Sequence, residues 1–170
     1  VEPNALMHTQ LRRSMDKAHA EALAAGIEDL RLTLFDGTLE DYARSTEGLS
    51  DEARRFDVVA TLLVLCSVPE GPAEALATCA RLLKPRGRLL YLEHVQGRTS
   101  TLRAVQRAIQ PVYGLFGDGC DLCRDTGGAI DLVEGANAWT RRHHREGSLA
   151  GGLLPLVCGV CEAPPPGKNR

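Results

Sequence analysis

Acidic and histidine side chains stand at the ends of several apolar segments, where an α/β protein builds its binding site. They are Glu2, Asp36 with Gly37 beside it, and the pair Glu93–His94. A carboxylate at a strand end accepts two hydroxyl hydrogen bonds and so is suited to hold a ribose. A surface position for Glu2 and a simple turn at Asp36–Gly37 remain the alternatives.

Cysteines offer a second kind of chemistry. The pairs Cys120–Cys123 and Cys158–Cys161 have the spacing of zinc ligands, although 34 residues lie between them. The second pair falls in an expected strand, where residues three apart face opposite sides. We therefore expect no bound metal, with a zinc-binding interaction module as an alternative. Cys66 and Cys79 lie in apolar segments and are expected to be small buried hydrophobes.

The elements that must position these residues alternate between helices and strands. Helices are expected over 5–25, over 73–83 starting at Pro72, over 102–112 with a kink or end at Pro111, and over 129–136, with a short helix and a loop within 38–55. Strands are expected over 30–35, 56–63 (buried on both faces), 88–95 after a break at Pro85–Gly87, and 153–161. This alternation predicts an α/β sheet with helices on both faces.

Length and charge narrow the class of protein. The chain has 170 residues, 44% of them hydrophobic, and a net charge of -2, which fits one globular domain. A nucleic-acid partner is not expected, because there is no basic excess to neutralise phosphates. The basic run 141–145 is interpreted as a solvated strand or turn, with contact to an anionic membrane surface as the rival interpretation. No stretch reaches the roughly 18 apolar residues of a spanning helix.

Several motifs together resemble one known family. They are Val1-Glu2-Pro3-Asn4, Phe56–Val59 followed by Thr61–Val68, Arg81–Gly87, Glu93-His94-Val95, and Asp118–Leu122 with Arg124–Thr126. The chain is similar to class I methyltransferases that use S-adenosylmethionine (SAM), and more narrowly to small methyltransferase-like proteins that include thiol S-methyltransferases. The resemblance covers most of residues 1–130. It implies a doubly wound, mostly parallel, Rossmann-like sheet.

The resemblance also implies roles for individual residues. Glu2 would bind the SAM ribose, Asp36 and Gly37 would contact the adenine, and Thr61, Leu62 and Leu63 would line the methionine half. Glu93 and His94 would lie at the acceptor as catalytic residues, and His94 would need to reach the acceptor to act as a base. Asp118, Gly119 and Cys120 would form part of an acceptor-side lid.

Two departures from the family pattern shape the functional expectation. The glycine-rich SAM loop and its preceding first strand are absent, and Arg86 stands where the family has a glycine. Because Val1–Asn4 has the pattern of a strand end, we expect a fragment: a partial methyltransferase domain over 1–163 and a flexible tail over 164–170.

The expected function is in-line methyl transfer from SAM to a small-molecule acceptor, such as a thiol or a lipid-like compound. The alternative is a degenerate, non-catalytic protein of the same fold that acts in protein interaction. We expect an intracellular location, cytoplasmic or peripheral to an internal membrane, with membrane contact through a segment upstream of Val1.

Overall fold

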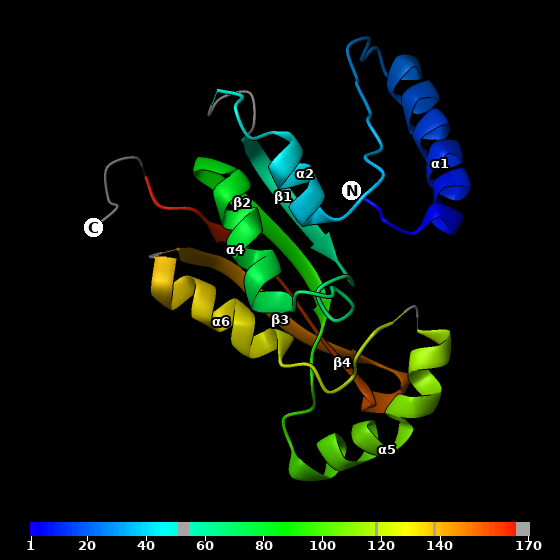
Figure 1. Cartoon of the computed structure of the whole chain (residues 1–170), viewed down its shortest axis with the longest axis vertical. Helices are drawn as coiled ribbons and strands as arrows, with labels where there is room; N and C mark the ends of the chain where they lie inside the picture. Colours follow the sequence, from blue (N-terminus) through cyan, green and yellow to red (C-terminus); the bar gives the residue numbers. More distant parts are fainter. Residues whose placement is uncertain (51–54, 118, 138, 166–170) are drawn as a thin grey trace. The chain divides into compact units, whose positions relative to one another are not determined.

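The computed structural model describes residues 1–50, 55–117, 119–137 and 139–165, shown in Figure 1. The chain divides into two compact units, Val1–Gly48 and Leu49–Arg170. Each unit is described by itself below. The boundaries expected for the domain and its tail stay predictions.

The first unit contains two helices whose starts are capped by side chains. Helix α1 runs over Ala5–Ala24, and the side chain of Asn4 accepts a hydrogen bond from the Leu6 N–H at 3.0 Å. Helix α2 runs over Leu39–Ser45 and begins with a reciprocal capping box between Thr38 and Asp41. Both helices confirm the sequence predictions.

The prediction of a strand over 30–35 is wrong, because this segment has no strand pairing. Residues 1–4 also have no regular structure, although the Glu2 N–H donates to the Phe35 carbonyl at 3.1 Å. The two segments therefore lie together through a backbone hydrogen bond but form no ladder. An alternating pattern predicts a strand only where a partner strand supplies the remaining hydrogen bonds.

The second unit is built on a sheet of four strands in the order β1-β2-β4-β3. Their bounds are β1 Phe56–Leu62, β2 Leu83–His94, β3 Thr140–Leu149 and β4 Leu154–Glu162. Strand β1 is parallel to β2, and β4 is antiparallel to both β2 and β3. The strands expected at 56–63, 88–95 and 153–161 are confirmed, and the basic run 141–145 lies in β3.

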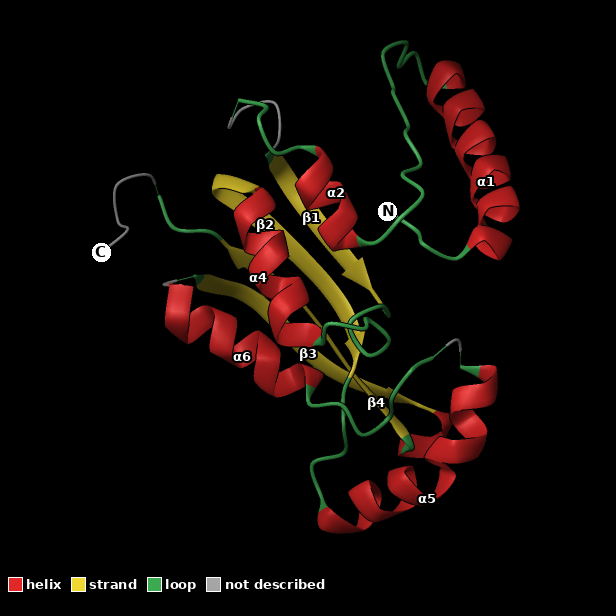
Figure 2. Cartoon of the chain, viewed as in Figure 1, coloured by secondary structure: helices red, strands yellow, loops and turns green. Residues whose placement is uncertain are grey.

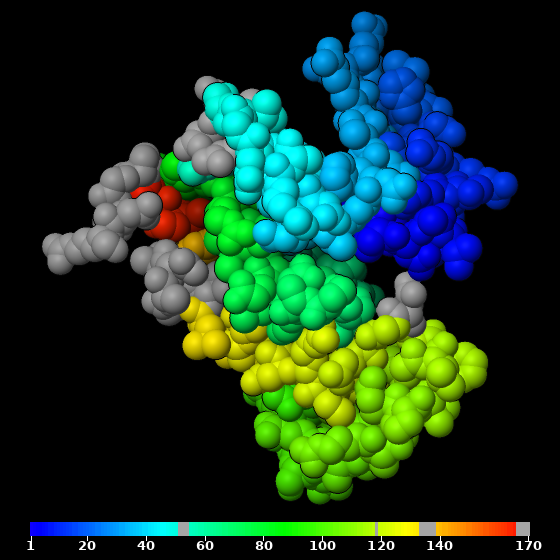
Figure 3. Space-filling view, viewed as in Figure 1, coloured from blue at the N-terminus to red at the C-terminus, as the bar shows by residue number. Residues whose placement is uncertain are grey.

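Helices accompany this sheet. They are α4 Pro72–Leu82, α5 Ser100–Phe116, α6 Thr126–Asn137 and the short 3-10 helix η1 Ala150–Gly152. Helix α4 packs on β1 and β2, and α6 lies alongside α4, as Figures 2 and 3 show. None of the described helices has the length and apolar character that crossing a membrane requires.

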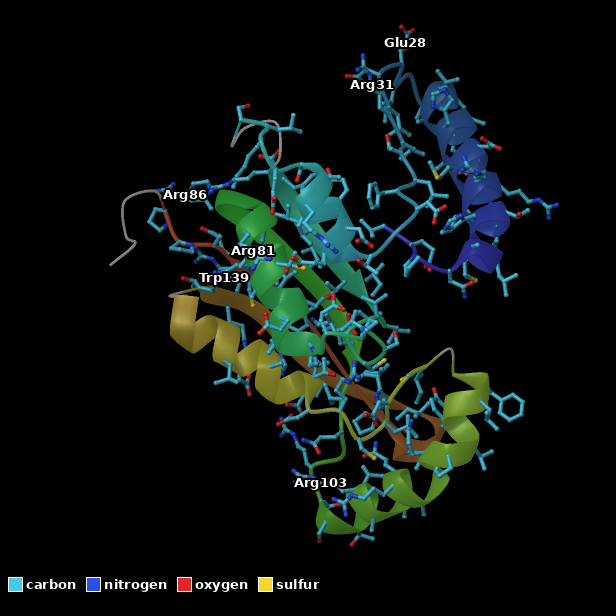
Figure 4. The ribbon with its side chains drawn as sticks, in the orientation of Figure 1. Glu28, Arg31, Arg81, Arg86, Arg103 and Trp139 are labelled. Atoms are coloured by element: carbon cyan, nitrogen blue, oxygen red, sulfur yellow. The ribbon has the colours of Figure 1, made fainter. Side chains whose placement is uncertain are left out.

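Helix α5 is anchored to the loop that precedes it. The buried Gln106 side chain accepts from the Gly97 N–H at 2.7 Å and donates to the Leu153 carbonyl at 3.1 Å. Arg103, labelled in Figure 4, donates from Nε to the Gly97 carbonyl at 2.7 Å. The helix continues through Pro111 to Phe116, and its ribbon changes direction along its length in Figure 1. Pro111 therefore does not end the helix.

Two strand predictions need correction. Strand β2 runs through Pro85–Gly87 without a break, because the extra residues form a bulge opposite Phe56 and Val58, with Arg86 at φ +62°. Strand β1 is not buried on both faces: Val58 is 48% and Leu62 is 61% exposed.

Candidate functional site

Three segments far apart in the sequence meet beyond the carboxyl ends of β1 and β2. They are the turn at Leu65–Ser67, the end of β2 at His94, and the loop after α5 that contains Cys120. The sulfurs of Cys66 and Cys120 and a ring nitrogen of His94 all lie within 4.8 Å of one another, and all three residues are buried. Within the described part of the chain, no other group of three or more His, Cys, Asp or Glu side chains is so close.

Glu93 holds the turn that follows β1. Its carboxylate is fully buried and accepts hydrogen bonds from the Leu65 N–H at 3.1 Å and the Val64 N–H at 3.5 Å. Burial raises the pKa of Glu93 to about 7, and the hydrogen bond from Leu65 opposes this shift. Leu63, at the end of β1, has a φ of +57°, an uncommon backbone conformation for a leucine. The turn is thus held in place by β2.

The loop after α5 is fixed to the same turn. The Asp121 N–H donates to the Cys66 carbonyl at 3.1 Å, and Arg124 Nη1 donates to the Val68 carbonyl at 2.6 Å. Gln110 of α5 binds both sides of Cys120, donating to its carbonyl at 3.1 Å and accepting from the Leu122 N–H at 2.7 Å. These hydrogen bonds hold the loop so that Cys120 lies next to Cys66.

The pKa values of the two thiols are shifted in opposite directions. Hydrogen bonding between the sulfurs, reinforced by burial, raises the pKa of Cys66. The same hydrogen bond lowers the pKa of Cys120; burial opposes this effect and the neighbouring His94 ring adds to it. The pair therefore favours a single negative charge, held between the two sulfurs. Neither ring nitrogen of His94 forms a hydrogen bond.

The expected ribose and adenine residues come together in the first unit. The Glu2 carboxylate accepts from the Asn4 N–H at 2.7 Å, and His8 Nε2 lies 2.8 Å from the Glu2 carbonyl and 3.7 Å from Asp36 Oδ1. The Asp36 side chain is 75% exposed. A Cβ at Gly37 would lie 2.8 Å from the Phe35 ring, so a larger residue would disturb this turn.

The other expected site residues lie in the second unit. Thr61 is buried in β1 and its hydroxyl forms no hydrogen bond, whereas Leu62 and Leu63 are 61% and 48% exposed. Gly119 is exposed, at φ +78°. Asp118 lies outside the described residues.

Sequence reasoning missed three contributors to the site. Cys66 was expected to be only a small buried hydrophobe, and Gln110 and Arg124 had no assigned role. The Leu-Cys-Ser block around Cys66 and the Arg-Asp-Thr block at Arg124 were already part of the family resemblance. The available signal was that these two blocks belong to the same set of family motifs as Glu93–His94.

Known proteins similar in sequence are methyltransferases. The family described as "Methyltransferase domain" matches residues 11–91. The thiol S-methyltransferase TMT1B of Rattus norvegicus is 41% identical over 115 residues, which are 66% of this chain and 45% of the rat protein. The thiol S-methyltransferase TMT1A of Homo sapiens is 37% identical over 76 residues, 44% of this chain and 31% of that protein. The chain thus spans less than half the length of these curated relatives.

Solved structures agree on the fold. An arsenic(III) S-adenosylmethionine methyltransferase from Chlamydomonas reinhardtii superposes with a TM-score of 0.60 at 19% identity, covering 95% of this chain and 54% of that one. A putative methyltransferase from Bacillus halodurans gives 0.55 at 13% identity, covering 85% and 77%. At these identities the likeness concerns the fold alone.

The chain therefore has the Rossmann-like α/β fold of the methyltransferases on which it superposes, and its residues 11–91 are similar to the methyltransferase domain. Among the relatives named above, the thiol S-methyltransferases agree with the resemblance seen in the motifs. The domain indicates SAM as the cofactor. Within the first unit, Glu2 and Asp36 offer carboxylates to hydroxyl and amino groups, which fits that cofactor.

Proposed function

We propose that this chain is part of a SAM-dependent methyltransferase that acts on small-molecule thiols. The observation that carries the proposal is the convergence of Leu65–Ser67, Glu93–His94 and the Cys120 loop beyond the carboxyl ends of β1 and β2. Ligands of open α/β sheets bind at this edge. The similarity to proteins named thiol S-methyltransferases supports the choice of acceptor.

The proposed contacts to the cofactor follow the family resemblance residue by residue. We assign the ribose and adenine contacts to Glu2, Asp36 and Gly37, and the methionine contacts to Thr61–Leu63. When bound, SAM supplies a methyl group already activated on a sulfonium. The protein therefore needs chiefly to align the acceptor and exclude water.

The acceptor side has two tasks, positioning and proton removal. Glu93 is a positioning residue, because its carboxylate holds the N–H groups of Val64 and Leu65. His94 is the base in this proposal: its ring nitrogens are buried and form no hydrogen bond, so one of them can take the proton of an acceptor thiol that enters the pocket. An ordinary thiol has a pKa of about 8.5, so removing its proton increases the reactive thiolate.

With SAM bound, His94 would take the thiol proton and pass it to solvent. The acceptor sulfur would gain the methyl group as its bond to the sulfonium breaks, and uncharged S-adenosylhomocysteine would leave. No oxidant or reductant is required.

The test is transfer of a labelled methyl group from SAM to a short alkanethiol by the full chain. We expect labelled thioether with the thiol and little product with the alcohol of the same carbon skeleton. Replacing His94 by Gln is expected to lower the rate by about 100-fold, the lower range for a general base. Replacing His143, an exposed histidine of β3, by Gln serves as the control.

Two outcomes would count against the proposal. No labelled product from a folded chain that binds SAM would favour the non-catalytic alternative. Equal rates for the His94→Gln and His143→Gln variants would remove His94 from the reaction.

A further inference from the structure

The three side chains that meet at the site form a donor set for a soft cation. Cys66, His94 and Cys120 are 1%, 4% and 9% exposed, and their ligand atoms lie within 4.8 Å of one another. They come from three separate segments, so the arrangement is a product of the tertiary fold. Two sulfurs and one imidazole nitrogen are ligands that zinc uses in proteins.

His94 supplies a second, independent observation. Both of its ring nitrogens are buried and neither forms a hydrogen bond in the structure. Burying a polar atom without a partner is unfavourable, so buried polar groups are nearly always satisfied. A metal ion between the ring and the two sulfurs would satisfy one nitrogen directly.

The spacing is close to that of a metal site. Zinc lies about 2.3 Å from sulfur and about 2.0–2.1 Å from nitrogen, which places tetrahedral donors about 3.5–3.8 Å apart. Donor atoms that lie within 4.8 Å of one another are close to this spacing.

The surroundings hold the donors in place before a metal arrives. A hydrogen bond from the Asp121 N–H to the Cys66 carbonyl joins the two cysteine segments. Gln110 forms hydrogen bonds with the backbone of Cys120 and Leu122. Such outer contacts orient ligands and contribute to metal affinity. His94 is the last residue of β2 and is positioned by the sheet.

We propose that Cys66, His94 and Cys120 bind one Zn²⁺ ion and leave its fourth position to a ligand from outside this trio. Binding releases the thiol protons to solvent, and the two thiolates balance the charge of the ion. The proposal departs from the expectation of no metal. It also differs from the Cys-x-x-Cys alternative, because Cys123, Cys158 and Cys161 are outside the trio.

Zinc binding goes beyond the proposed methyl transfer. A metal on His94 would turn the residue from a base into a ligand, and a thiol in the fourth position would lose its proton to solvent. His94 acting as a base and His94 acting as a metal ligand use the same group of side chains. Metal binding is therefore measured without SAM and without an acceptor, so its outcome is independent of activity.

The experiment uses the full chain, treated with EDTA, freed of chelator and kept reduced. Zn²⁺ is titrated against a chromophoric chelator, and Co²⁺ is added separately as a spectroscopic probe. We expect one metal per chain, a sulfur-to-cobalt charge-transfer band and the intense visible bands of a tetrahedral site. These signals from the unaltered chain do not depend on any variant being folded.

Variants assign the ligands. Cys66→Ser, Cys120→Ser and His94→Gln are each expected to weaken Zn²⁺ binding by at least about tenfold, the effect of losing one metal contact. Cys158→Ser, a partly exposed cysteine of β4, is expected to bind as the unaltered chain does. Circular dichroism of each variant establishes that it is folded.

Clear results would overturn the proposal. One is that the reduced, folded chain binds no stoichiometric Zn²⁺. The other is that all four variants bind Zn²⁺ as tightly as the unaltered chain does. Loss of binding only in Cys158→Ser would instead support the Cys-x-x-Cys alternative.

Discussion

Glu93 is a carboxylate whose environment makes its protonation depend on folding. It is fully buried, its pKa is raised to about 7 from the usual 4.5, and its two backbone partners belong to the turn that carries Cys66. A raised pKa means that the native state binds this proton more tightly than the unfolded state. The stabilisation by the protonated form is complete below about pH 4.5 and is lost as the pH rises through about 7.

Replacing Glu93 by Gln should remove this dependence. Gln keeps an oxygen for the Leu65 N–H but carries no charge. From about pH 5 to about pH 8, we expect the free energy of unfolding of the unaltered chain to fall relative to that of the variant by about 1–3 kcal/mol. Urea unfolding at both pH values, with EDTA present, measures the difference.

The exposed carboxylate of Glu70 provides the control. Glu70→Gln should show no such pH-dependent difference. A Glu93→Gln variant whose relative stability is the same at both pH values would contradict the raised pKa.

At the scale of elements, the centre of the sheet depends on one small residue. Gly159 of β4 lies opposite both Tyr91 of β2 and His144 of β3, and the Tyr91 hydroxyl and His144 Nδ1 hydrogen-bond over it at 2.9 Å. A Cβ at Gly159 would collide with the His143 carbonyl oxygen and with the Tyr91 hydroxyl. The strand pairing therefore requires glycine there.

Gly159→Ala should destabilise the chain by about 3 kcal/mol, because a backbone atom must move to admit the methyl group. Gly147 of β3 is the matched control, since no atom lies within 4 Å of a Cβ built there. Gly147→Ala should change stability by no more than about 0.5 kcal/mol. Denaturant unfolding of the two variants side by side tests the claim, and equal effects would refute it.

Particular elements show how far sequence reasoning extended. Helices α1, α2 and α4 were predictable because caps, helix formers and Pro72 are local signals. The exposure of β1 was not predictable, because burial depends on which strands and helices cover it. The bulge in β2 was mistaken for a break, since Pro85 and Gly87 give the same local signal for both.

At the scale of the whole molecule, the apolar core belongs to the second unit. Every buried hydrophobic residue of the described chain lies between Leu65 and Ala163, whereas α1 has no buried residue. Helices without tertiary burial depend on local propensity and open readily.

Hydrogen exchange should therefore distinguish the units. We expect the amides of α1 to exchange faster than those of β2 by about 100-fold or more, because local fraying is enough to open them. Mass spectrometry of peptides from Ala5–Ala24 and Leu83–His94 measures the two rates. Comparable protection in both peptides would show that α1 is stabilised by burial.

The sequence by itself determined most helices and strands of the second unit, the methyltransferase resemblance and the candidate residues Glu2, Asp36, Glu93, His94 and Cys120. These follow from local propensity and from motifs that are contiguous in the chain. Only the tertiary structure decided that Cys66 joins His94 and Cys120 in one buried cluster. That meeting depends on the hydrogen bonds of Glu93, Asp121 and Gln110, which link segments far apart in the chain. No local pattern encodes a contact that exists only when two loops are held against the end of one strand.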